Sequence, residues 1–196
     1  LFPTSIAQAV EQRVVDVVAV SWSGAPIIQD KFQRVVDSID QSVGPQWLSF
    51  TSLEGDARDK KILFYKGRDL PAPISISAPM PCTGYQSSNF MGDVRQEAYR
   101  RLGITNFADR YLIIVAPQAG CIWQGKAMLG KPGEKGGILT LHDNSSSFVI
   151  VHELGHSLGL GHSNLLQCDG GARDGNWGRE CRAVEYGGAI DVMGNV

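Results

Sequence analysis

The sequence predicts an α+β fold, in which strands and helices follow one another within a single domain. Short, nearly continuous apolar runs rich in β-branched residues alternate with segments whose apolar residues recur at helical spacing. From residue 161 onward the chain is instead rich in glycine and has no long periodic segment. We therefore expect a folded body over residues 1–160 and a short irregular C-terminal subdomain over residues 161–196.

The first strand and the first helix have the clearest patterns. Residues 13–22 are almost continuously apolar and β-branched, which is typical of a strand that is buried on both faces. Pro26 suits the first turn of a following helix, and Gly44 with Pro45 predicts its end. The apolar side chains on one face of this helix are Ile28, Phe32, Val35, Ile39 and Val43.

Two further strands, at 60–67 and 73–77, are expected next, and a second amphipathic helix follows them. The polar run 87–89 supplies candidate N-caps for this helix, and Gly103 predicts its end. Residues 111–116 are entirely apolar and predict another buried strand.

The segment before the last helix is predicted to contain an edge strand. Residues 122–130 have a strand-like pattern that polar residues and glycines interrupt, which is typical of an edge. A glycine-rich turn and a short strand at 138–142 come next. The polar run 143–147 then supplies N-caps for a helix that continues to Leu158.

Composition and charge exclude several classes of protein. The 196 residues contain 18 Lys and Arg against 20 Asp and Glu, so the chain has no basic excess for binding nucleic acid. No apolar run approaches the roughly 20 residues that span a bilayer. We expect a monomer with no nucleic-acid partner and no membrane span. Because the chain begins at Leu1 and not at Met, we also expect a processed or trimmed product.

The four cysteines indicate the cellular compartment. They form no CxxC pair, which argues against a zinc ribbon. We expect two disulfides in a secreted or extracellular protein, with four buried thiols in a cytosolic protein as the alternative. A bridge between Cys168 and Cys181 would close a glycine-rich loop with little apolar content, and Cys82 would then pair with Cys121.

The stretch HELGHSLGLGH, which begins at His152, contains the residues that indicate chemistry. His152 and His156 are four residues apart, so on a helix they share one face and can bind one zinc ion. Glu153 stands beside the first of these ligands. His162 can join them only if the helix breaks, and Gly159 can adopt the positive φ that such a break requires.

This pattern resembles HExxHxxGxxH, the signature of the metzincin clan of zinc metallopeptidases. Met193, in the segment DVMG, fits the methionine-bearing turn that lies beneath the zinc in that clan. The pairing of HELGHSLGLGHSN with EYGGAIDVMGN looks most like the gametolysin-like family. Members of the astacin and serralysin type have Tyr two residues after the methionine, where this chain has Asn195.

The resemblance implies a metzincin-like catalytic domain over residues 1–196, with a twisted mixed β-sheet, a backing helix and an active-site helix. It also implies a zinc-dependent endopeptidase that hydrolyses peptide bonds of extended polypeptides. The three motif histidines would hold one catalytic zinc, and Glu153 would act as general base on a zinc-bound water.

The edge strand that lines the cleft in metzincins corresponds here to Gly125, Lys126 and Ala127. An extended substrate could pair with its backbone. An ordinary edge strand that Lys126 protects is the alternative.

Two other functional hypotheses stay open. A zinc-stabilised binding module that has lost turnover would have no need for the carboxylate of Glu153, which the chain retains. A metal-free structural domain would require the histidine spacing to be accidental. Metal analysis followed by a peptide-cleavage assay separates the three hypotheses.

Four weaker features complete the sequence-based expectations. The acidic loop 169–180 is a weak calcium candidate, because its spacing matches no EF-hand loop, and we expect it to be solvated. His142 is expected to cap the following helix or lie on the surface, and Ser157 to face out of the helix. Tyr186 is near the motif turn in sequence, but no pattern directs it to the site.

Overall fold

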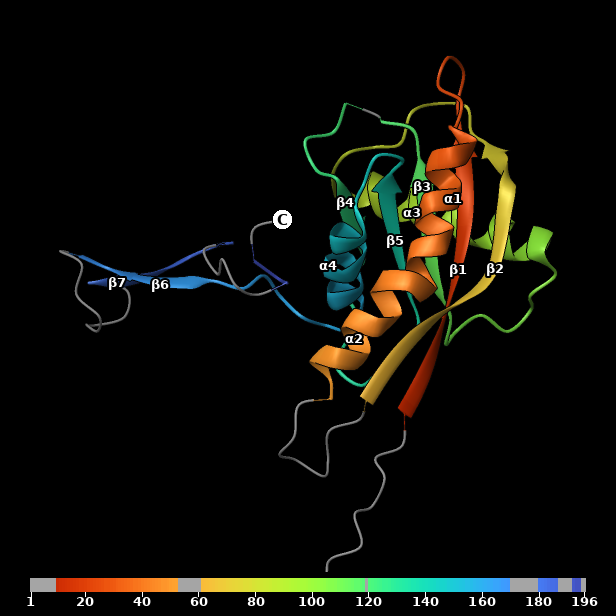
Figure 1. Cartoon of the computed structure of the whole chain (residues 1–196). Coiled ribbons are helices and arrows are strands. Elements are labelled where there is room, and N and C mark those ends of the chain that lie inside the picture. The colour runs from red at the N-terminus through yellow and green to blue at the C-terminus, as the bar shows by residue number, and fades with distance from the viewer. Residues whose placement is uncertain (1–9, 53–60, 119, 170–179, 187–191, 195–196) are drawn as a thin grey trace, which may run out of the picture.

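The chain folds around a five-stranded mixed sheet with the strand order β2-β1-β3-β5-β4 (Figure 1). The computed structural model describes residues 10–52, 61–118, 120–169, 180–186 and 192–194. Four strands run parallel, and β4 runs antiparallel to β5 at one edge. The predicted α+β class with a mixed sheet is therefore confirmed. The strands are β1 (Val10–Ser21), β2 (Lys61–Ser75), β3 (Tyr111–Ala116), β4 (Gly125–Ala127) and β5 (Gly137–His142).

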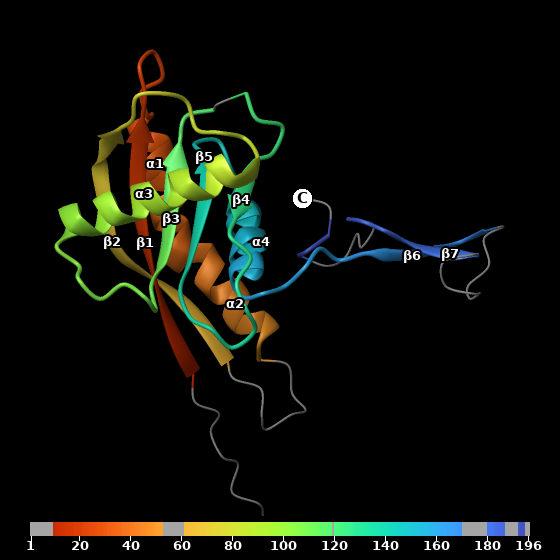
Figure 2. The same ribbon diagram turned by 180° about the vertical axis from the view of Figure 1, so that it is seen from behind.

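Helices cover both faces of this sheet, as the two opposite views in Figures 1 and 2 show. Side chains from α1, η1, α2 and α4 form one hydrophobic core with one face, and α3 packs on the other. The central strand β3 contributes alternately to both cores, which explains why all its residues are apolar. The bounds of these elements are α1 (Gln29–Ser38), the π-helical η1 (Ile39–Val43), α2 (Gly44–Phe50), α3 (Gly84–Leu102) and α4 (Ser147–Ser157).

The first helix does not end at Gly44 and Pro45, so that prediction is wrong. It begins at Gln29 and continues through η1 into α2, with the Gly44 N–H bonded to the carbonyl of Ile39 in the wider π turn. A side chain on Gly44 would collide with the carbonyl oxygen of Phe64 in β2. This glycine therefore permits close packing of the helix on the sheet, which a sequence pattern for helix ends cannot distinguish from termination.

The strands predicted separately at 60–67 and 73–77 form one continuous strand, β2. Two register shifts against β1 let β2 continue past the interruption, and Asp16 lies at the first shift. Its carboxylate accepts the backbone N–H of Arg68 at 2.7 Å and two bonds of 2.6 Å from the guanidinium of Arg110. These bonds stabilise the irregular pairing, and they join residues far apart in sequence.

The second helix and the edge strand also differ from their predicted bounds near a disulfide. Helix α3 begins at Gly84 and not in the polar run 87–89, although it ends at Gly103 with φ +64° as predicted. The edge strand β4 is shorter than the predicted 122–130. The bridge between Cys82 and Cys121 joins the chain just before these two elements.

The C-terminal part of the chain contains an antiparallel ribbon of β6 (Leu165–Cys168) and β7 (Cys181–Val184), which the predicted irregular subdomain did not include. Strands of four residues are too short to show a period. Figure 1 shows the ribbon projecting from the body near α4. Its far end is closed by the disulfide Cys168–Cys181, so both predicted bridges are confirmed. Among the described residues, no helix has the length and apolar character needed to cross a membrane.

Candidate metal centre

Helix α4 carries the first two histidines and Glu153 between the sheet and the surface. Its apolar side chains join the core on the sheet, and His152 and Glu153 are also buried. The helix ends in a Schellman motif, because the N–H of Gly159 bonds to the carbonyl of His156 and that of Leu160 to the carbonyl of Gly155. Gly159 has φ +91°, as the predicted helix break requires.

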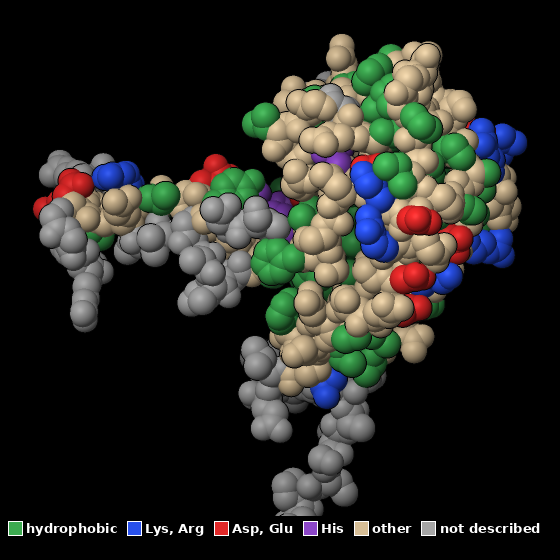
Figure 3. Space-filling view, turned by 45° about the horizontal axis from the view of Figure 1, so that its top comes forward, with side chains coloured by type: hydrophobic (Ala, Val, Ile, Leu, Met, Phe, Trp, Pro, Cys, Tyr) green, Lys and Arg blue, Asp and Glu red, His purple; other side chains and the backbone are tan. Residues whose placement is uncertain are grey.

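The turn at Gly159 brings His162 back to the helix. One ring nitrogen from each of His152, His156 and His162 lies within 4.8 Å of the others, so the three side chains could hold a metal ion. The Nε2 atoms of His156 and His162 are 3.0 Å apart. His152 is buried, whereas His156 and His162 are partly exposed, and histidine side chains are visible at the surface in Figure 3.

The other ring nitrogens bind acceptors that determine the tautomer of each imidazole. His152 Nδ1 lies 2.8 Å from the carbonyl of Val192, and His156 Nδ1 lies 2.8 Å from that of Leu160. His162 Nδ1 lies 2.7 Å from the carboxylate of Glu185. Because these oxygens only accept hydrogen bonds, each Nδ1 carries the proton and Nε2 is the atom that can coordinate a metal.

This arrangement fits a zinc ion. With the protons on Nδ1, the Nε2 lone pairs of His156 and His162 face each other at 3.0 Å. Two acceptors at that distance repel unless a cation lies beside both. Neutral imidazoles coordinating through Nε2 are typical zinc ligands, and three of them leave a coordination position open.

Glu153 lies next to this cluster in a confined setting. Its side chain, His152 and Tyr186 line the same cavity of about 220 Å³. Burial raises the pKa of the Glu153 carboxyl to about 7, although a hydrogen bond from the backbone of Ala127 acts in the opposite direction. A Cβ on Gly125 would lie 2.7 Å from Cγ of Glu153, so β4 packs directly against this side chain.

Met193 lies against α4 at Gly155, the residue before His156. The thioether of Met193 is buried, and a side chain on Gly155 would collide with its sulfur. Its carbonyl accepts the N–H of Ser163 at 2.7 Å, which connects the methionine turn to the third histidine. Gly155 therefore lets α4 pack closely against Met193.

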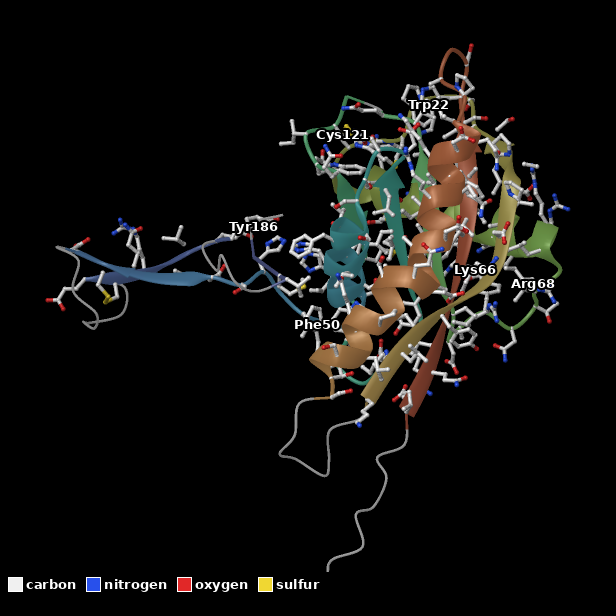
Figure 4. The ribbon with its side chains drawn as sticks, in the orientation of Figure 1. Trp22, Phe50, Lys66, Arg68, Cys121 and Tyr186 are labelled. Atoms are coloured by element: carbon white, nitrogen blue, oxygen red, sulfur yellow. A yellow bond between two sulfur atoms is a disulfide. The ribbon has the colours of Figure 1, made fainter. Side chains whose placement is uncertain are left out.

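Sequence reasoning missed the roles of Glu185 and Tyr186 in this site. The ring of Tyr186 lies 3.8 Å from the ring of His162 and 6.4 Å from that of His152, measured between centroids. Figure 4 places Tyr186 where the ribbon meets α4. No sequence signal could have found these two residues, because a ribbon of two short strands brings them to His162.

Two weaker predictions about single residues are wrong. Ser157 is buried and donates to the carbonyl of Glu153, because Gly137 on β5 leaves room for its side chain. His142 is also buried and neither caps a helix nor lies on the surface. Its ring stacks on Trp123 with a centroid distance of 4.7 Å, on the side of the sheet away from α4.

The remaining predicted residues are placed as follows. Lys126 extends from β4 toward the carbonyl of Cys82, at 3.4 Å, and does not approach the histidines in any contact of the described residues. Within the acidic loop proposed for calcium, residues 170–179 lie outside the described part of the chain.

No protein-family profile and no curated protein match this chain. Among solved structures it is similar to metalloproteinase-II from Bacteroides fragilis, with 14% sequence identity over 82% of this chain and a TM-score of 0.49. The matched part spans 46% of that protein. The chain is also similar to a protein in a chaperone–substrate complex, with 18% identity, a TM-score of 0.41, and coverage of 79% of this chain and 24% of that one.

Proposed function

We propose that this chain is a zinc-dependent endopeptidase of the metzincin type. The observation that carries the proposal is the pair of Nε2 atoms on His156 and His162, 3.0 Å apart and both available for coordination, next to a buried carboxyl. His152, His156 and His162 would hold the zinc. A purely structural zinc site would have four protein ligands.

The metal ion and the side chains around it would have separate roles in peptide hydrolysis. Zinc, when bound, would supply a Lewis acid that lowers the pKa of a water molecule and polarises a carbonyl. Glu153 would take the proton from the attacking water and deliver it to the leaving amine. Its side chain is buried and lines a small cavity beside His152, which supports a role in proton transfer.

An extended polypeptide is the substrate class that β4 supports. The carbonyl of Gln124 and the N–H of Met128 bond to β5, so strand alternation turns the backbone groups of Gly125 and the carbonyl of Ala127 to the open edge, where the Ala127 N–H already bonds to Glu153. A substrate strand could add there, beside Glu153. The two disulfides are compatible with secretion, and we propose a secreted or extracellular protein.

Membership of the gametolysin-like family is the finer part of the proposal. It is supported by the motif that starts at His152 and by the segment around Met193. The contact of Met193 with α4 at Gly155 agrees with a methionine turn beneath a zinc site.

Metal analysis combined with peptide cleavage tests the proposed function. We expect one zinc per chain in protein purified without chelator, and cleavage of a peptide library that a chelator abolishes and added zinc restores. Glu153→Gln should retain zinc and fold but lose about 10²–10⁴-fold in cleavage rate, because its amide cannot accept the proton.

Protein that lacks stoichiometric zinc would overturn the metal site. Stoichiometric zinc with no cleavage of any library peptide would support the zinc-stabilised binding module instead. Near-normal cleavage by Glu153→Gln would show that another group serves as the base.

A further inference from the structure

We propose that the ribbon of β6 and β7 positions the third zinc ligand through Glu185 and Tyr186. These two residues act as a clamp on the imidazole of His162, setting its tautomer and its orientation. The inference rests on the zinc site of the proposed function, and it assigns a role to a part of the chain outside the histidine motif.

The clamp begins with a hydrogen bond from His162 to an otherwise exposed carboxylate. His162 Nδ1 donates to Glu185 at 2.7 Å, although the Glu185 side chain is 69% exposed. The first two histidines donate to backbone carbonyls, which are fixed by the path of the chain. The described contacts of His162 include a side-chain partner for Nδ1, so its tautomer depends on a residue that can be replaced.

Tyr186 supplies the second contact. Its ring lies 3.8 Å from the ring of His162 at an interplanar angle of 37°, and this contact restricts rotation of the imidazole. Tyr186 has φ +60°, and it is the one residue other than glycine with positive φ in the described part of the chain. Such a backbone conformation is costly for a bulky residue and persists where surrounding contacts enforce it.

The ribbon brings His162 and the two clamp residues together. Leu165 pairs with Val184 at its near end, so His162 and Glu185 leave the same end of the two strands. The disulfide Cys168–Cys181 closes the far end of the paired segment. The paired strands therefore restrict how far the third ligand and its clamp can separate, in the way that helix α4 restricts the first two ligands.

The test measures the His162 tautomer and the zinc affinity in Glu185→Ala, Glu185→Gln and Tyr186→Ala. In the metal-free protein at a pH where imidazole is neutral, two-bond ¹H–¹⁵N spectra should show wild-type His162 protonated on Nδ1. Glu185→Ala should give a mixture of tautomers and about 10–100-fold weaker zinc binding in competition with a chromophoric chelator. Glu185→Gln, which retains an acceptor oxygen, should lose less.

Asp169→Asn provides the matched control on the same ribbon. Asp169 forms an ion pair with Arg182, accepting a hydrogen bond at 3.1 Å from its guanidinium, but has no described contact with His162. We expect this variant to keep the wild-type tautomer and zinc affinity. An unchanged tautomer and affinity in Glu185→Ala would overturn the proposal, as would an equal loss in Asp169→Asn. Because the His162 tautomer is measured in the metal-free protein, it tests the clamp proposal even if the wild type proves to bind no zinc.

Discussion

Helix α4 and the segment that follows it hold the same three histidines in different ways. His152 and His156 belong to a helix that packs into the core, and backbone carbonyls orient both rings. His162 lies beyond the turn at Gly159 and is oriented by Glu185 and Tyr186 from another part of the chain. The comparison indicates a division of roles, in which the helix supplies two fixed ligands and the carboxyl for proton transfer, and the following segment supplies a third ligand whose orientation sets how tightly metal is held.

Substitution of Gly125 tests the helix side of this comparison and has the largest expected effect. A Cβ at this position would lie 2.7 Å from Cγ and 2.8 Å from Oε1 of Glu153. Gly125→Ala should therefore displace the carboxyl and lower kcat by up to about 10²-fold, because small misplacement of a catalytic group is costly. Zinc content, measured by elemental analysis, should stay at the wild-type value. A fall in zinc content that accounts for the lost rate would contradict the division of roles.

Substitution of Gly159 tests the segment after the helix, which presents His162. Alanine at φ +91° costs about 1–2 kcal/mol and brings its Cβ to 2.9 Å from Cδ and N of Pro132. We expect Gly159→Ala to weaken zinc binding about tenfold, and Gly159→Val to weaken it further, because a β-branched residue tolerates positive φ poorly.

Two neighbouring glycines provide controls for this experiment. Gly161→Ala should leave zinc affinity unchanged, because its Cβ meets nothing within 4 Å. Gly155→Ala pushes on the flexible side chain of Met193, so a loss of no more than about threefold is expected. If Gly159→Ala, Gly161→Ala and Gly155→Ala all bound zinc with the same affinity, the turn would not depend on glycine at position 159.

Removal of each disulfide should separate the two regions with smaller effects. Replacing Cys168 and Cys181 by alanine frees the ribbon and should weaken zinc binding about fivefold, since the bridge restricts the chain around the clamp. Replacing Cys82 and Cys121 should leave zinc affinity unchanged and lower the cleavage rate. The carbonyl of Cys82 accepts the Nε1–H of Trp123 at 2.9 Å, and Trp123 lines the cavity beside Glu153.

Chelator competition and peptide cleavage on the same two preparations measure these outcomes. Zinc loss in the variant without Cys82 and Cys121, or full zinc affinity in the variant without Cys168 and Cys181, would contradict the comparison. Thermal unfolding of both variants serves as the control for a general loss of stability, to which each bridge contributes about 3–4 kcal/mol in the loop-closure model.

The pattern of apolar residues predicted the elements that depend on neighbours along the chain. The buried strand β3, the helix that carries His152, and the positive φ of Gly159 all follow from periods or backbone preferences within a few residues. The disulfide pairing could be predicted because four cysteines allow few combinations. The same local rules misjudged Gly44 and Ser157, whose surroundings come from distant strands.

By itself the sequence determined the fold class, the three histidines that come together and the helix break, because helical spacing and glycine conformation act within one or two turns of chain. Only the tertiary structure decided that Met193 packs beneath α4, that Gly125 presses on Glu153, and that Glu185 and Tyr186 reach His162. Each of these contacts joins residues more than 20 positions apart. Such contacts depend on how sheets, turns and disulfides bring the chain back on itself, and no local period records that.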